Sequence, residues 1–231
     1  MKTLMALAGA LALATGAQAA TYDAFDSFNG VQGAGGFYYL RMSAVQGVPP
    51  VQLATSGNCV VTSDFCLQDG ASLPGVYKSL TGLSEGTYTV PNDRLLVHPG
   101  QNVPIGILFV APEAGVYDFT ASFDVLDRSP TGVFITGFSS IGGAVSGAFA
   151  GLLNSQTTAF TRTGSFTLAQ GDLLGFIVNP AGSYSNDSTG VDIRITSAAG
   201  AVPEPATWAM MILGFGMAGG IFRRRASLTP A

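Results

Sequence analysis

The sequence is poor in charge, histidine and cysteine, and each shortage excludes a class of protein. Charged side chains make up 10% of the 231 residues, against ~25% in an ordinary soluble domain. One histidine and two cysteines cannot build a zinc ribbon, an iron–sulfur centre or a multi-histidine metal enzyme. The net charge is −4 and the only basic run is Arg223–Arg225, so the cationic stripe of a nucleic-acid binder is missing. The sequence also contains no G-x-x-x-x-G-K-S/T phosphate loop and no G-x-S-x-G nucleophile elbow.

The first residues have the pattern of a secretory signal peptide. Lys2 is followed by the apolar run Leu4–Thr15, and Ala17-Gln18-Ala19 offers the small side chains that signal peptidase admits. A buried N-terminal helix is the alternative, but it would need an amphipathic face, and this run is apolar all round. We therefore expect secretion across the inner membrane and cleavage by signal peptidase after Ala19 or Ala20.

The C-terminal end combines an extended motif with an apolar run. Ala206–Phe222 is apolar and would reach about 25 Å as a helix, close to the ~30 Å hydrocarbon core of a bilayer. Arg223–Arg225 closes this run, and such arginines stay on the cytoplasmic side. The preceding Pro203-Glu204-Pro205 cannot be helical throughout, so it is expected to be extended and exposed, as a protease cleft requires.

Val202–Met211, the Gly-rich apolar run and the three arginines together resemble a PEP-CTERM sorting signal. The resemblance implies a Gram-negative-type exported protein that an exosortase-type membrane transpeptidase processes near Pro-Glu-Pro. It also implies transient contact with the membrane through the C-terminal helix and delivery to the cell surface or an exopolysaccharide matrix. A plain C-terminal anchor helix is the alternative. The residues to which the resemblance gives sorting and processing roles are Pro203, Glu204, Pro205, Trp208, Arg223, Arg224 and Arg225.

The two ends leave one domain between them. We predict a signal peptide at 1–19, a secreted domain at 20–200, a PEP-CTERM sorting segment at 201–225 with a transmembrane helix at 206–222, and a cytoplasmic tail at 226–231. The secreted domain holds six basic and 13 acidic side chains, a formal charge of −7. Simple charge attraction to acidic polymers is therefore not expected, which leaves neutral or cation-bridged glycans open.

Several segments of this domain alternate as β-strands do. In Val116–Leu126, aromatic and apolar side chains at Tyr117, Phe119 and Phe123 alternate with polar ones. The same logic turns Phe134, Phe138, Phe166 and Leu168 toward the core. The remaining predicted strands are Phe37–Met42, Arg94–Val97, Gly106–Val110, Gly132–Phe138, Phe160–Leu168, Leu173–Val178 and Val191–Thr196.

These short strands, separated by turn signals, predict an all-β fold, an antiparallel β-sandwich of the jelly-roll type. Residues 43–93 are the least patterned and are expected to form a long excursion from the sandwich. Four turn-rich motifs, at Leu96–Gly100, Ala111–Tyr117, Leu168–Asp172 and Asp187–Asp192, resemble secreted bacterial modules of the carbohydrate-binding-module-like jelly-roll type. This resemblance implies the fold first, and a function carried over from it is an analogy.

Cys59 and Cys66 lie close together in an exported chain, which predicts a disulfide, because oxidising compartments favour one. A redox or metal pair is the alternative, but the spacing fits neither a C-x-x-C motif nor a zinc knuckle.

His98 is the only imidazole available for catalysis. An enzyme would pair it with a nucleophile such as Ser129 or Ser165 and an acid such as Asp93 or Asp127, but nothing in the sequence brings these groups together. A histidine before Pro-Gly at a strand end is more often a turn residue. A glycosidase would need two carboxylates about 5–9.5 Å apart, and the sequence selects no pair. We therefore predict no catalytic residue and no enzyme.

The sequence predicts either no cofactor or a structural calcium ion, because several acidic side chains lie near strand ends. Carboxylates and carbonyls at such ends can converge on a hard cation. The calcium candidates are Asp124, Asp127, Asp187 and Asp192. There is no EF-hand pattern, and Asp187–Gly190 is equally well explained as a tight turn.

Sugar-binding faces present tyrosine or tryptophan rings to the C–H face of a sugar. The secreted domain has no tryptophan, so the ligand-binding candidates are Tyr38, Tyr39 and Tyr184. Loop aromatics such as Tyr184 can also be lids over the core. The preferred hypothesis is a non-enzymatic surface or matrix protein that associates with extracellular polysaccharide. The alternatives are a structural or adhesive module with a protein partner, and a secreted glycoside hydrolase or esterase.

Overall fold

The computed structural model describes residues 19–43, 48–55 and 57–199. The predicted signal peptide, the sorting segment with its transmembrane helix and the tail lie outside these residues. Within them, no helix is long and apolar enough to cross a membrane.

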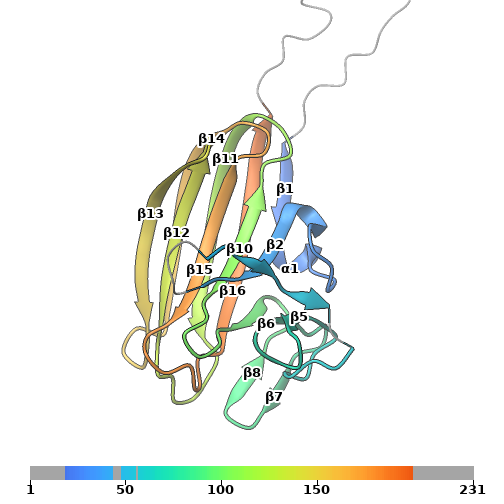
Figure 1. Cartoon of the computed structure of the whole chain (residues 1–231), viewed down its shortest axis with the longest axis vertical. Coiled ribbons are helices and arrows are strands. Elements are labelled where there is room, and N and C mark those ends of the chain that lie inside the picture. Colours follow the sequence, from blue (N-terminus) through green and yellow to red (C-terminus); the bar gives the residue numbers. More distant parts are fainter. Residues whose placement is uncertain (1–18, 44–47, 56, 200–231) are drawn as a thin grey trace, which may run out of the picture. The chain divides into compact units, whose positions relative to one another are not determined.

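The described residues form a sandwich of two antiparallel sheets with jelly-roll connectivity (Figure 1). Its eight principal strands are β9 (Leu95–His98), β10 (Ile105–Val110), β11 (Gly115–Val125), β12 (Val133–Ile141), β13 (Ala144–Leu153), β14 (Ala159–Leu168), β15 (Leu173–Pro180) and β16 (Thr189–Ala199). In sheet A the order is β14-β11-β16-β9, and in sheet B it is β13-β12-β15-β10. Among these eight strands, only β12 and β13 are successive strands in one sheet, and every other connection crosses between the sheets. The predicted jelly-roll-like β-sandwich is confirmed.

Further strands widen both sheets. Sheet B continues from β10 to β2 and β3, and sheet A continues from β9 to β6, β5 and β4, while β1 pairs with β16. A separate hairpin joins β7 to β8. The remaining bounds are β1 (Ala20–Asp23), α1 (Ala24–Ser27), the 3₁₀ turn η1 (Ala34–Gly36), β2 (Phe37–Arg41), β3 (Val51–Gln52), β4 (Ala54–Thr55), β5 (Phe65–Asp69), β6 (Ser72–Lys78), β7 (Leu83–Glu85) and β8 (Tyr88–Val90).

The expectation that residues 43–93 leave the sandwich is wrong for β5 and β6. These strands extend sheet A and bury Leu67 and Val76 in the main core. Pro74 and Gly75 lie inside β6, and both residue types are typical of turns and not of strand interiors. This composition is why the segment does not look like a strand in the sequence.

The inner faces of the two sheets meet in an aromatic-rich core. Tyr117, Phe119 and Phe123 of β11 are buried, as the alternation predicts. Phe119 and Phe123 approach Phe176 of β15, in the opposite sheet, with ring centroids 5.7 and 6.4 Å apart. Aromatic pairs at such distances add to the stability gained from burial.

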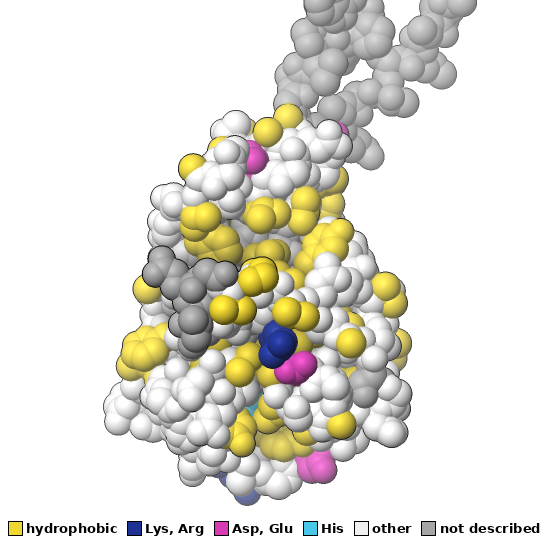
Figure 2. Space-filling view, viewed as in Figure 1, with side chains coloured by type: hydrophobic (Ala, Val, Ile, Leu, Met, Phe, Trp, Pro, Cys, Tyr) yellow, Lys and Arg dark blue, Asp and Glu magenta, His cyan; other side chains and the backbone are white. Residues whose placement is uncertain are grey.

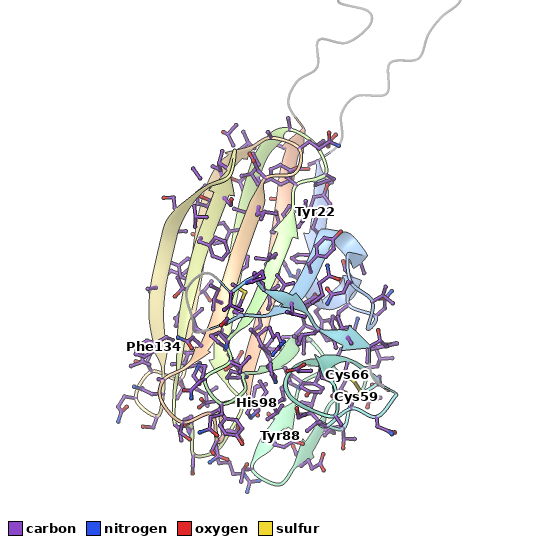
Figure 3. All side chains as sticks on the ribbon, viewed as in Figure 1. Tyr22, Cys59, Cys66, Tyr88, His98 and Phe134 are labelled. Atoms are coloured by element: carbon purple, nitrogen blue, oxygen red, sulfur yellow. A yellow bond between two sulfur atoms is a disulfide. The ribbon has the colours of Figure 1, made fainter. Side chains whose placement is uncertain are left out.

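The inward orientation predicted for Phe134 and Phe138 is wrong, because both have the outward parity of β12. Val133 and Ile135 of β12 are buried, and Phe134 between them is 49% exposed (Figure 3). Strand side chains alternate with period two, so an error of one residue reverses every orientation in the strand. Both parities of Val133–Phe138 contain apolar residues, and for this reason alternation could not identify the buried face.

The predicted disulfide between Cys59 and Cys66 is confirmed, with the two Cα atoms 5.9 Å apart (Figure 3). Cys66 belongs to a second, smaller core with Val61, Tyr77, Val90 and Leu96. The bond therefore fastens the loop before β5 to the widened part of sheet A.

Alanine substitutions at Phe123 of β11 and Phe134 of β12 test which face of each strand is buried. Phe123→Ala should lower the free energy of unfolding by about 3–5 kcal/mol, because it opens a cavity between the sheets. Phe134→Ala should cost less than about 1 kcal/mol, because the ring is half exposed. Urea denaturation of both variants measures the two costs. Equal losses would contradict the assignment of the outer face.

Candidate functional site

The face of sheet B that points away from the core is free of charge at its centre. None of β10, β12, β13 and β15 contains a charged residue. Figure 2, drawn from the same side as Figure 1, shows hydrophobic side chains spread over the visible surface with few charged ones between them. We call the outward residues of β2, β10, β12, β13 and β15 the sheet-B face.

A row of side chains crosses this face. In the strand register, Phe138 lies opposite Gly175, Gly175 opposite Leu108, and Leu108 opposite Tyr38. Partners across strands lie on the same face, and three strand spacings of ~4.8 Å separate Phe138 from Tyr38 by about 14 Å. A Cβ atom on Gly175 would collide with the Phe138 ring. The missing side chain therefore lets this ring lie over the neighbouring strand.

Phe134 extends the apolar surface beyond this row. It precedes Phe138 by four residues and therefore lies on the same face. Its strand partners are Leu152, which is 39% exposed, and Asn179. Thr136 and Ser140 also have the outward parity of β12 and are partly exposed. The face thus combines aromatic rings with uncharged hydrogen-bonding groups.

The three tyrosine candidates lie in different parts of the structure. Tyr38 lies on the sheet-B face and is partly exposed, with its hydroxyl near Gly33. Tyr39 is 1% exposed in the core, and its hydroxyl donates to the carbonyl of Ala24 at 3.4 Å. Its ring therefore offers no surface to a sugar, which corrects that candidate. Tyr184 lies elsewhere, in the loop between β15 and β16, with its ring 6.4 Å from that of His98.

His98 is a buried residue of β9 with a local partner. Its Nδ1–H donates to the carbonyl of Pro99 at 2.8 Å. Burial lowers its pKa, against the opposing effect of Asp127 and Asp187. Among the described residues, no hydroxyl is hydrogen-bonded to the His98 ring, so the arrangement lacks the nucleophile–base contact of acyl-transfer enzymes.

The four calcium candidates have different partners and do not form one site. Asp124 pairs with Arg94 at 2.8 Å, and Asp192 lies 3.7 Å from Arg194. Asp127 and Asp187 instead accept backbone hydrogen bonds, Asp127 from Ser188 at 2.8 Å and Asp187 from Gly132 at 2.9 Å. Across the described residues, no three His, Cys, Asp or Glu side chains gather into a metal-binding group.

A polar hollow of about 420 Å³ lies beside the disulfide, and no sequence motif indicates it. Its lining includes Asn29, Thr55, Thr62 and Asp64.

The lowered pKa of His98 predicts a pH-dependent stability. The unfolded chain, with a histidine pKa near 6.5, binds a proton that the folded chain rejects. The free energy of unfolding should therefore be unaffected by His98 above about pH 6.5. Below that pH it should decrease as the pH falls toward the lower pKa of His98 in the folded chain. Urea unfolding at pH 7.5 and 5.5 measures this loss.

His98→Asn is the control, because its amide can still donate to the carbonyl of Pro99 and does not titrate. Burial raises the pKa of Asp187, so the protonation of Asp187 increases the free energy of unfolding as the pH falls. This contribution is opposite to that of His98 and is present in both the wild type and His98→Asn. A pH profile that is unchanged by His98→Asn would show that His98 is not the group responsible.

Comparison with known protein families identifies the C-terminal motif. Residues 201–226 match the PEP-CTERM protein-sorting motif. One similar solved structure is a family 35 carbohydrate-binding module from Clostridium thermocellum, at 15% identity over 53% of this chain and 91% of that chain, with a TM-score of 0.34.

Murine APRIL at pH 8.5 is also similar, at 13% identity over 70% of this chain and 98% of that chain, with a TM-score of 0.28. A CBM4 structure is 13% identical over 48% of this chain and 74% of that chain, with a TM-score of 0.26. No curated protein matches the sequence. The chain carries a PEP-CTERM sorting motif, and is thereby an exported protein that is sorted to the cell envelope and processed by an exosortase.

Proposed function

We propose that this protein is a non-enzymatic component of the cell surface or extracellular matrix that associates with polysaccharide through the sheet-B face. The observation that carries the proposal is the combination on this face of partly exposed aromatic rings, Phe134, Phe138 and Tyr38, with no charge on β10, β12, β13 and β15. Uncovered apolar surface of this kind marks a binding face.

The chemistry of the face favours a neutral sugar polymer. Aromatic rings stack on the C–H faces of sugars, and Thr136, Ser140 and Asn179 can hydrogen-bond sugar hydroxyls without the desolvation cost of a charge. The secreted domain has a formal charge of −7, from six basic and 13 acidic side chains. An acidic polymer would be repelled, whereas a neutral polymer would not be.

A non-enzymatic role is supported by the state of the one imidazole. His98 is buried, its pKa is lowered by burial, and its Nδ1–H is already bonded to Pro99. A secreted hydrolase that uses this histidine would need a hydroxyl nucleophile beside it. Turnover in a broad screen of glycan and ester substrates would contradict this part of the proposal.

Polysaccharide binding should depend on the exposed rings. Phe134→Ala and Tyr38→Ala should each weaken binding to the producing cell's purified polysaccharide about three- to tenfold, because one aromatic contact contributes about 0.5–1.5 kcal/mol. Leu80→Ala is the matched control, since Leu80 is 56% exposed in the turn before β7, outside the sheet-B face. Affinity electrophoresis or co-sedimentation measures the change.

Other outcomes of this experiment discriminate between the alternatives. Equal retention of all three variants would exclude the sheet-B face as the binding surface. Recovery of proteins but no sugar by the wild type would favour the structural or adhesive module with a protein partner.

Delivery should require the extended motif before the apolar run. Replacing Pro203, Glu204 and Pro205 together by alanine should leave the C-terminal segment attached and the protein in the membrane fraction, whereas the wild type is shortened and reaches the surface or matrix. Intact mass and cell fractionation measure both effects. Glu113→Ala, an exposed acidic change in the secreted domain, is the control. Normal shortening of the triple-alanine variant would exclude processing at this motif.

A further inference from the structure

A cluster of oxygen atoms lies where the loop between β15 and β16 meets the loop between β11 and β12. The hydroxyl oxygen of Thr131 is 3.1 Å from the carbonyl oxygen of Ser183, 2.7 Å from that of Ser185 and 2.7 Å from Oδ1 of Asp187. A hydroxyl carries one proton and can donate to one acceptor. With Asp187 ionised, two of these close oxygen–oxygen contacts therefore have no proton between them.

The carboxylate in this cluster is buried and incompletely satisfied. Asp187 is 2% exposed. Its Oδ1 accepts from the backbone N–H of Gly132 at 2.9 Å as well as from Thr131, but its Oδ2 is buried with no hydrogen-bond partner. No Lys or Arg among the described residues forms an ion pair with Asp187. A buried carboxylate without a counter-charge is costly.

We propose that these oxygens bind a calcium ion, with Asp187 as a bidentate ligand, the Ser183 and Ser185 carbonyls as backbone ligands and the Thr131 hydroxyl as the fourth group. Oxygens about 2.3–2.6 Å from one ion lie roughly 2.7–3.3 Å from their neighbours in the coordination shell, which is the spacing observed around Thr131. Calcium explains both the crowded oxygens and the unpartnered Oδ2. It also supplies the missing positive charge.

The site is open on one side and closed on the other. Thr131, Ser183 and Ser185 are exposed, so an ion can enter from solvent and water can complete a shell of six to eight ligands. Asp127 is not part of the site, because its carboxylate accepts from Thr87 and from the backbone N–H of Ser188. The bound ion joins two loops at one end of the sandwich and does not depend on glycan binding.

Terbium luminescence and thermal unfolding of the full chain in mild detergent test the site. Tb³⁺ should bind with a signal sensitised by Tyr184, which lies between the two carbonyl ligands in the sequence, and Ca²⁺ should displace it with a Kd of about 0.1–1 mM, as in other extracellular modules. In 10 mM Ca²⁺ the Tm should rise by roughly 3–10 °C. The Tyr184→Phe variant should keep the Tm shift and lose most of the luminescence.

Two ligand variants and one control make the test specific. Asp187→Asn should remove the Tm shift, and Thr131→Val, which keeps the shape of the side chain, should weaken Ca²⁺ binding at least about tenfold. Asp118→Asn changes an exposed carboxylate on the outside of β11 and should leave both signals unchanged. If Asp187→Asn does not fold, Thr131→Val and the wild type decide. A folded wild type without a Ca²⁺-dependent Tm shift, or a Thr131→Val variant that binds like the wild type, overturns the proposal.

Discussion

The packing of sheet A against sheet B is the constraint on which the surface chemistry of this protein depends. Phe119 and Phe123 contact Phe176 across the sandwich, and each buried residue fixes the orientation of its neighbours because strand side chains alternate with period two. Burial of Ile135 and Phe176 therefore turns Phe134 and Phe138 outward and leaves Gly175 beneath the Phe138 ring. The sheet-B face follows from the core packing.

Much of the fold was predictable, and each error in the prediction has a physical reason. Between its two end residues, Val116–Leu126 has apolar residues on one parity only, so both the strand and its buried face were predicted correctly. Val133–Phe138 is apolar on both parities, so the strand was predicted and its face was not. β13 was missed because Ala, Gly and Ser dominate a strand with little buried surface, and β6 was missed because Pro74 and Gly75 are typical of turns.

The candidate sites were less predictable because they depend on parity and on backbone atoms. Tyr38 and Tyr39 are chemically identical neighbours, and only the packing of β2 makes one a surface residue and the other a core residue. The oxygen cluster uses the carbonyls of Ser183 and Ser185, which every residue type possesses, so the sequence carries no signal for them. Asp187 was the one calcium candidate from the sequence that belongs to the cluster, whereas Asp124 and Asp192 have arginine partners instead.

The distribution of charge connects the two proposed sites. A formal charge of −7 on the secreted domain favours solubility through mutual repulsion, yet β10, β12, β13 and β15 contain none of these charges. The acidic groups lie in the loops and in the other strands, where arginine partners hold some of them. Asp187 lacks such a partner and is buried, so a cation from solvent can neutralise it. The same domain can thus repel its copies through its acidic parts and retain one neutral face for an uncharged polymer.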